Sequence, residues 1–129
     1  MLLAVLHRMK NDATLTSLLG ATAQDSRIYP LSVGDFEPSI CYADTDIEDS
    51  GVVRTSRLEL RISAKSYEKV TQIRDRLREL LNIAEDEVGF TYSGVIVMSS
   101  TLNGGGVLEF EGADVFQRFM YFDVKWRTA

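Results

Sequence analysis

The chain has 129 residues, of which 45% are hydrophobic and 26% charged, with a mean hydropathy of -0.05. These values are typical of one globular domain over residues 1–129, and no apolar run approaches the roughly 20 residues that cross a bilayer. The net charge of -5 argues against nucleic-acid binding by the whole surface, and the single cysteine excludes an intrachain disulfide framework.

Two short helices are predicted at the N-terminus. Asn11 or Asp12 can cap the second helix, which covers residues 13–19 and ends at Gly20. Charged residues follow the apolar start at once and no positive region precedes it, so we expect a cytosolic start rather than a signal peptide. The first helix covers residues 1–10, with one apolar face formed by Leu2, Leu3, Leu6 and Met9.

The next segments alternate between extended pieces and polar loops. Residues 28–30 form a brief extended piece, because a residue before proline is pushed out of helical geometry. A loop over residues 31–37 precedes a strand over 38–43. The acidic connection 44–51 then leads into the following strand, which predicts a long hairpin over residues 38–65.

Residues 54–82 give the strongest structural signal. They open as an alternating strand and change period at Ser66, where a helix begins. A short turn between the two lets both apolar faces close on each other. The strand face is formed by Leu58, Leu60, Ile62 and Ala64, and the helix stripe by Tyr67, Val70, Ile73, Leu77, Leu80 and Leu81.

The C-terminal part is rich in strand signals. Residues 88–100 favour β-structure with Gly94 as a bulge, 103–106 form a flexible hairpin tip, and 107–111 form a short strand. The last strand, 116–127, has a core face, and its other face still carries Phe119 and Tyr121. Strands grouped around one helix predict an α+β fold: a mostly antiparallel β-sheet packed against one long helix, with short N-terminal helices.

No stretch predicts catalytic, cofactor-binding or metal-binding chemistry. The acidic stretch 44–51 starts like a calcium loop, but Asp49 and Thr55 occupy the positions that need glycine and glutamate. One histidine, His7, and one cysteine, Cys41, cannot fill a zinc ligand set. The glycine run lacks the Gly-Lys-Ser/Thr of a phosphate loop, and no acidic spacing singles out a general acid and base. We therefore expect no enzyme and no cofactor.

The charge is unevenly distributed. Residues 54–82 hold eight basic and four acidic residues, a net +4, so the rest of the chain carries -9. Two interpretations stay open. The basic stretch can be a solvated face beside acidic loops, or the subunit can carry two complementary surfaces.

The order of these segments resembles a family. An N-terminal helix is followed by 11–20, Arg-Ile-Tyr-Pro at 27–30, the strand 38–42, an alternating strand ending at 63–67, the helix 70–81 and the closing strand 116–124. Nearly the whole chain resembles the tail-completion proteins of long-tailed bacteriophages and prophages, also called tail-terminator or tail-to-head joining proteins.

The resemblance implies a structural virion protein without enzymatic activity. Such proteins form a ring, generally hexameric, that caps the tail tube, ends its polymerisation and presents the surface that joins the head. The implied partners are copies of the chain, the tail tube protein and a head-completion or connector protein. DNA passes only through the lumen, no membrane is involved, and the protein sits at the virion tail end after assembly in the host cytoplasm. The alternatives are an α+β adaptor or binding module, such as another neck or head-completion protein, and a small enzyme.

A closed ring requires a head-to-tail contact between two different patches of the subunit. We expect an acidic patch and the basic outer face of the central strand to meet across the subunit boundary. Phe119 and Tyr121 can add apolar area there, or can pack under the first helices. The acidic patch is Asp44, Asp46, Glu48 and Asp49, and the basic face is Arg57, Arg61 and Lys65.

Overall fold

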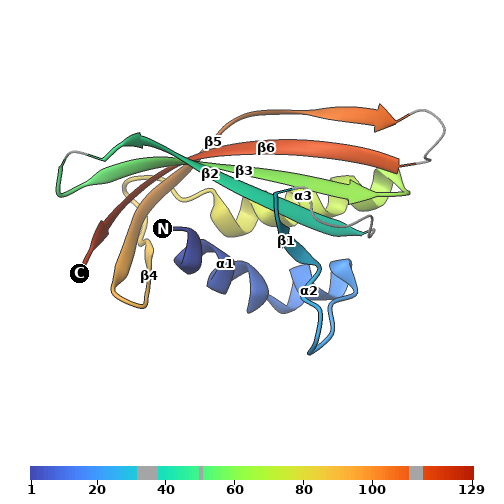
Figure 1. Ribbon diagram of the computed structural model, residues 1–129, viewed down its shortest axis with the longest axis horizontal. Coiled ribbons are helices and arrows are strands. Elements are labelled where there is room, and N and C mark those ends of the chain that lie inside the picture. The colour runs from blue at the N-terminus through green and yellow to red at the C-terminus, as the bar shows by residue number, and fades with distance from the viewer. Residues whose placement is uncertain (32–37, 50, 111–114) are drawn as a thin grey trace.

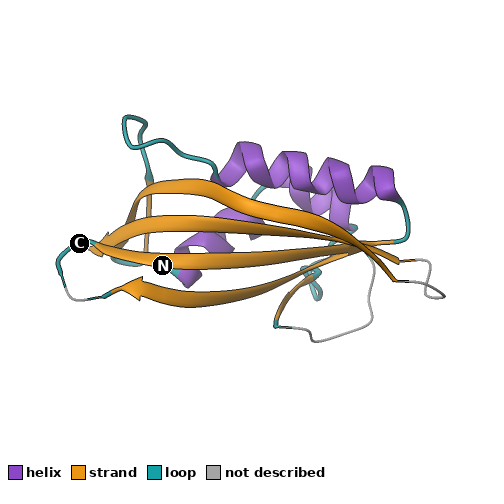
Figure 2. Cartoon of the chain, turned by 90° about the horizontal axis from the view of Figure 1, so that it is seen from above, coloured by secondary structure: helices purple, strands orange, loops and turns teal. Residues whose placement is uncertain are grey.

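Six strands form one curled sheet, and three helices lie on one of its faces (Figures 1 and 2). The computed structural model describes residues 1–31, 38–49, 51–110 and 115–129. No described helix is long and apolar enough to cross a membrane. In chain order the elements are α1 (Leu2–Lys10), α2 (Ala13–Leu19), β1 (Ile28–Pro30), β2 (Ser39–Glu48), β3 (Arg54–Ala64), α3 (Tyr67–Leu81), β4 (Phe90–Tyr92), β5 (Val95–Phe110) and β6 (Val115–Thr128).

The strands are arranged in the order β1-β2-β3-β6-β5-β4. β1 pairs with β2 in parallel, and every other neighbouring pair is antiparallel. The hairpin predicted over residues 38–65 is confirmed, because β2 and β3 pair along almost their whole length. β6 then inserts between β3 and β5, so β3 and β6 are central strands with partners on both sides.

The core lies between the sheet and the helices. Leu58, Leu60 and Ile62 on β3 are fully buried, as their alternation predicts. The stripe of α3 packs over them and is confirmed from Val70 to Leu81, whereas Tyr67 is 50% exposed and stacks edge-on against Phe116. Other helix residues buried in the core are Ala4, Val5, Leu6, Met9, Leu15 and Leu19.

Side-chain caps fix the helix ends. The Ser66 hydroxyl accepts a hydrogen bond from the Lys69 amide at 3.3 Å, and the Asp12 carboxylate accepts one from the Leu15 amide at 2.9 Å. Gly20 ends α2 with φ 68°, a left-handed conformation that suits glycine. The predicted helix boundaries are therefore confirmed at Ser66, Asp12 and Gly20.

The expected fold class is wrong. The structure is mostly β, a curled six-stranded half-barrel with three short helices, and no single long helix covers the sheet. The longest helix, α3, has 15 residues and shares the face with α1 and α2 (Figure 2). The sequence interpretation underestimated the strands, because polar and glycine-rich stretches read as loops when their strand partners are unknown.

Three local predictions are corrected. The tip expected at 103–106 lies inside β5, and the acidic residues 44–48 extend β2 rather than leave it. Gly94 forms, with Ser93, the tight β4–β5 turn, where both residues have positive φ (79° and 51°). The expected loop at 32–37, position 50 of the acidic connection and residues 111–114 after β5 lie outside the described residues.

The largest fully buried side chain belongs to Phe122 on β6. We expect Phe122→Ala to lower the free energy of unfolding by about 3–5 kcal/mol, because the change removes buried apolar surface and leaves a cavity. Leu3→Ala is the control. Leu3 is 69% exposed, so its truncation should change stability by less than about 0.5 kcal/mol. Equal losses in urea titrations of the two variants would contradict this core.

Arg76 on α3 binds the carboxylate of Asp12 through its Nε atom at 2.8 Å. This bond, with the Leu15 amide, holds the pKa of Asp12 below its ordinary value. Since the folded pKa is the lower one, the stabilisation is complete above about pH 4 to 5 and is lost as pH falls through the folded pKa.

We expect Asp12→Asn, which keeps a capping oxygen, to lower the free energy of unfolding by about 1–2 kcal/mol at neutral pH. The variant should also lose less stability than the wild type as the pH falls. Thermal melts from pH 7 to 2 measure both effects. Asp86→Asn, at an exposed turn carboxylate, is the matched control. An Asp12→Asn curve parallel to the wild-type curve would rule out this linkage.

Candidate subunit interface

The sheet face opposite the helices carries polar and aromatic side chains. Along β3 these are Arg57, Glu59 and Arg61, whose direct partners on β6 are Asp123, Tyr121 and Phe119. Directly paired residues point to the same side of a sheet. The structure therefore brings the predicted residues Arg57, Arg61, Phe119 and Tyr121 together on one surface, named here the outer face. Phe119 and Tyr121 do not pack under the first helices.

The arginines of the outer face already have partners within the subunit. Arg57 Nε donates to Asp123 Oδ1 at 3.3 Å, and the side-chain amide of Asn103 donates to the other oxygen, Oδ2, at 2.7 Å. The Arg61 guanidinium lies over the Phe119 ring, 5.4 Å from its centroid. Arg57 is exposed, and exposed ion pairs contribute little to stability, so it can exchange partners on contact with another molecule. Arg61 is half-buried, and its Nε atom is buried without a hydrogen-bond partner among the described residues. Lys65 follows β3 and is exposed.

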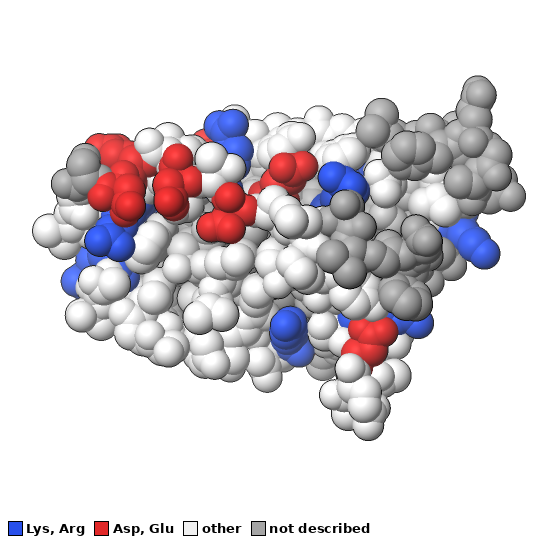
Figure 3. Space-filling view, viewed as in Figure 1, with Lys and Arg blue, Asp and Glu red and all other residues white. Residues whose placement is uncertain are grey.

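Only part of the acidic patch lies away from the outer face. Asp44 and Asp46 stand opposite Leu58 and Ser56, so both point to the helix side of the sheet. An irregularity after Asp46 then brings Glu48 opposite Thr55. Figure 3 shows acidic side chains gathered toward the hairpin end of the molecule. Thr55 and Arg57 are two residues apart on β3, so Glu48 lies on the outer side of the sheet whereas Asp44 and Asp46 do not. Pairing of the acidic patch with the basic face between subunits stays a prediction.

Asp49 is already engaged at the end of the hairpin. Its carboxylate lies 3.0 Å from Arg54 Nε, and the Arg54 guanidinium lies 5.2 Å from the Trp126 ring centroid. Trp126 in turn donates its indole hydrogen to the Ser56 hydroxyl at 3.0 Å. This chain of contacts ties the tip of the β2–β3 hairpin to β6.

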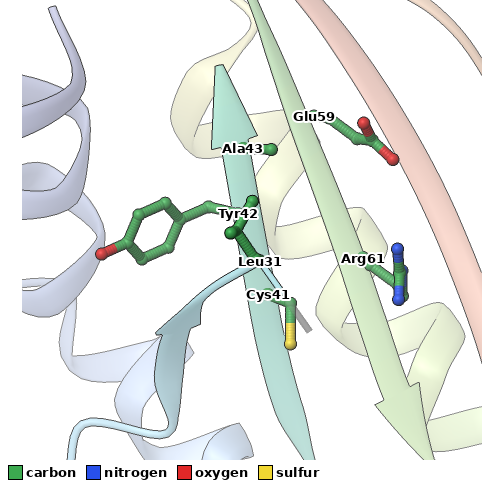
Figure 4. Close-up of a pocket in the computed structure, with 6 residues that line it drawn as sticks. All are labelled: Leu31, Cys41, Tyr42, Ala43, Glu59 and Arg61. Atoms are coloured by element: carbon green, nitrogen blue, oxygen red, sulfur yellow. The ribbon is translucent and has the colours of Figure 1, made fainter. Parts of the chain in front are cut away.

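Two hollows open on the outer side of the sheet. The first, of about 340 Å³, is lined by Leu31, Cys41, Tyr42, Ala43, Glu59 and Arg61. In Figure 4 the Cys41 and Arg61 side chains point the same way, and the Tyr42 ring points away from them. Burial raises the pKa of the Cys41 thiol, which disfavours the thiolate that a nucleophile requires. His7 stacks on Tyr92 with ring centroids 3.8 Å apart, on the helix side, so it cannot pair with Cys41.

The second hollow was missed by the sequence interpretation. It holds about 360 Å³ and is lined by Gly105, Gly106, Val107, Phe119 and Tyr121. The glycines leave uncovered backbone beside two aromatic rings, which makes an apolar surface next to the edge of β5. The signal in the sequence was the glycine run itself, because a glycine inside a strand often marks a place where another backbone approaches closely.

The end of the β2–β3 hairpin is a further feature that the sequence interpretation missed. Ile47, Val52 and Val53 are 51%, 80% and 41% exposed. Ile47 lies within the connection 44–51, which was interpreted as polar, and Val52 and Val53 lie between that connection and the strand predicted from residue 54. Among the described residues, no three histidine, cysteine, aspartate or glutamate side chains are grouped to hold a metal ion.

No protein-family model matches the sequence, and no curated protein matches it. Seven chains of solved structures do match the fold. One of them belongs to a structure described as the virion of a native gene transfer agent (GTA) particle. The two chains share 14% identity and superpose with a TM-score of 0.73, over 97% of this chain and 92% of the other. At this identity, the likeness shows that the two chains share a fold.

Proposed function

We propose that this chain is a structural protein of a phage-like virion, and within it a tail-completion protein. The observation that carries the proposal is the fold, which is shared almost end to end with a chain of a gene transfer agent virion. The order of sequence segments, which resembles tail-completion proteins, supports the same role independently. Six copies form a ring that caps the tail tube, ends its polymerisation and joins the head.

The ring uses a head-to-tail contact between different surfaces of neighbouring copies. One side is the acidic patch on β2, and the other includes the outer face with Arg57, Arg61, Lys65, Phe119 and Tyr121. The uncovered aromatic area of the outer face supports this assignment, because aromatic residues are enriched in protein interfaces and charged groups set their register. The tail tube protein and a connector protein bind the two ends of the ring, and DNA passes through its lumen.

The purified chain should form rings with a central hole in negative-stain images, and light scattering should give six times the subunit mass at high concentration. Arg57→Glu/Arg61→Glu should raise the concentration at which rings dissociate by about threefold or more, because it turns attraction toward the acidic patch into repulsion. This effect should weaken as salt is added.

Lys10→Glu/Arg78→Glu is the charge-matched control, with both changes at exposed helix positions. Its rings should dissociate at the wild-type concentration. Thermal melts should show both double variants folded, since exposed ion pairs contribute about 0–1 kcal/mol. A wild-type monomer at every concentration tested would contradict the ring and favour an adaptor protein.

A further inference from the structure

Two stretches of the sheet border lack a strand partner among the described residues. β1 covers β2 as far as Tyr42, whose carbonyl accepts a hydrogen bond from the Leu31 amide at 2.8 Å. β4 covers β5 only over Val95–Val97. Residues 43–46 of β2 and 105–108 of β5 therefore present open edges, and Figure 1 shows this part of β5 along one border of the sheet. Open edges are templates for pairing with another strand.

Both open stretches have regular strand geometry. Residues 43–46 pair with β3 without a shift, and residues 105–108 pair with β6 without a shift. The irregularities of these strands lie outside both stretches: after Asp46 on β2, and between Val97 and Ser99 and between Leu102 and Gly105 on β5. A bulge would turn an edge away from a partner, and neither stretch contains one.

The direction of the two strands suits a ring. β2, β3, β6 and β5 are joined by three successive antiparallel pairings, so β5 runs opposite to β2. Rotation about an axis that runs along the strands keeps every strand direction. The β2 strand of a neighbouring copy would then meet β5 in the antiparallel sense, which is slightly the more stable pairing.

The charges favour contact between unlike edges over contact between like edges. Two β2 edges brought together would oppose Asp44 and Asp46 with the same carboxylates of the second copy, and like charges directly opposite are destabilising. Residues 105–108 of β5 carry no charge. On the helix side, Arg118 of β6 stands directly beside Val107. Arg118 donates from one terminal nitrogen to the Tyr67 hydroxyl at 3.4 Å, and its Nε atom is buried without a hydrogen-bond partner among the described residues.

The glycines of β5 allow close approach of a second backbone. Among the described residues, a Cβ atom added at Gly106 would meet nothing within 4 Å, so the outer face above that residue is open. The apolar hollow formed with Phe119 and Tyr121 adjoins the same edge. A neighbouring strand here would cover uncovered backbone and aromatic surface together.

We propose that residues 43–46 of a neighbouring copy add to the edge of β5 as an antiparallel strand, so that one sheet continues from subunit to subunit. Thr45 of the neighbouring copy stands opposite Gly106, and Asp44 of that copy stands opposite Val107, within reach of Arg118. This contact rests on the proposed ring and specifies how its subunits join. Arg57 and Arg61 lie on β3, one strand farther from the β5 edge than Arg118 and on the opposite face of the sheet. Charge reversal at these two residues should therefore weaken the ring less than charge reversal at Arg118.

A disulfide between the two edges tests the register. Directly opposite residues of an antiparallel pair have Cα atoms about 4.5–5.5 Å apart, which a disulfide spans. Mild oxidation of Thr45→Cys/Gly106→Cys rings should give a ladder of covalent oligomers up to the ring mass on non-reducing gels. Each single variant is a control for the buried Cys41 and should give no ladder. Asp44→Cys/Gly106→Cys, whose side chains would point to opposite faces, should give none either.

A charge exchange tests the contact without relying on a disulfide. Arg118→Glu and Asp44→Arg should each raise the ring dissociation concentration by about tenfold or more, and the double variant should return it to within about threefold of wild type. Thermal melts of all three variants should show folded protein. Losses that merely add in the double variant would overturn the Asp44–Arg118 contact.

The outcomes separate this contact from the ring itself. Rings that stay intact in images but yield no ladder from Thr45→Cys/Gly106→Cys would overturn the edge contact and leave the proposed function standing. Full dimerisation of Gly106→Cys alone would show β5 pairing with β5, which also overturns it. A wild-type chain that forms no ring at all would overturn both proposals.

Discussion

One-sided burial of β3 is the constraint on which the rest of the structure depends. Leu58, Leu60 and Ile62 are fully buried, and the residues between them point out of the other face. Because side chains alternate along a strand, a shift of one residue would exchange the two sets. The register of β2 and β6 against β3 follows from this, and so does the position of α3, whose stripe covers the buried set. The outer face is formed by the side chains that the core does not bury.

The outer face is the surface that the proposed ring uses for contacts. Arg57, Arg61, Phe119 and Tyr121 lie on it, and we expect removal of the Arg57 charge to cost the fold little, because its ion pair with Asp123 is largely exposed. The two open edges lie at the borders of the same sheet. In the proposed ring, the helix-covered face keeps the subunit stable, and the other face and both borders make the contacts, so a change that weakens assembly need not weaken folding.

The sequence predicted the elements whose signals are local. The face of β3, the stripe of α3 and the caps at Ser66, Asp12 and Gly20 depend on residues a few positions apart, and the structure confirms them. The face on which Asp44 lies was harder to predict, because it depends on pairing with Leu58 on the next strand. The strand structure of residues 103–106 was harder still to predict. Glycine has little preference for strands, and only the ladder to β6 makes this stretch part of β5. The open edges could not be predicted at all, since an edge is defined by the strand order of the whole sheet.

Gly105 and Gly106 are adjacent glycines, yet the fold tolerates substitution at the two positions to different degrees. A methyl group at Gly105 would lie 2.3 Å from the carbonyl oxygen of Phe119. The backbone of Gly105 also has a φ of 154°, which residues with a side chain rarely adopt. Among the described residues, a methyl group at Gly106 would meet nothing within 4 Å. Substitution of Gly105 would therefore disturb the fold of a single chain. Substitution of Gly106 would not meet a steric obstacle of this kind. If related chains hold glycine at both positions, the second glycine records selection for a partner.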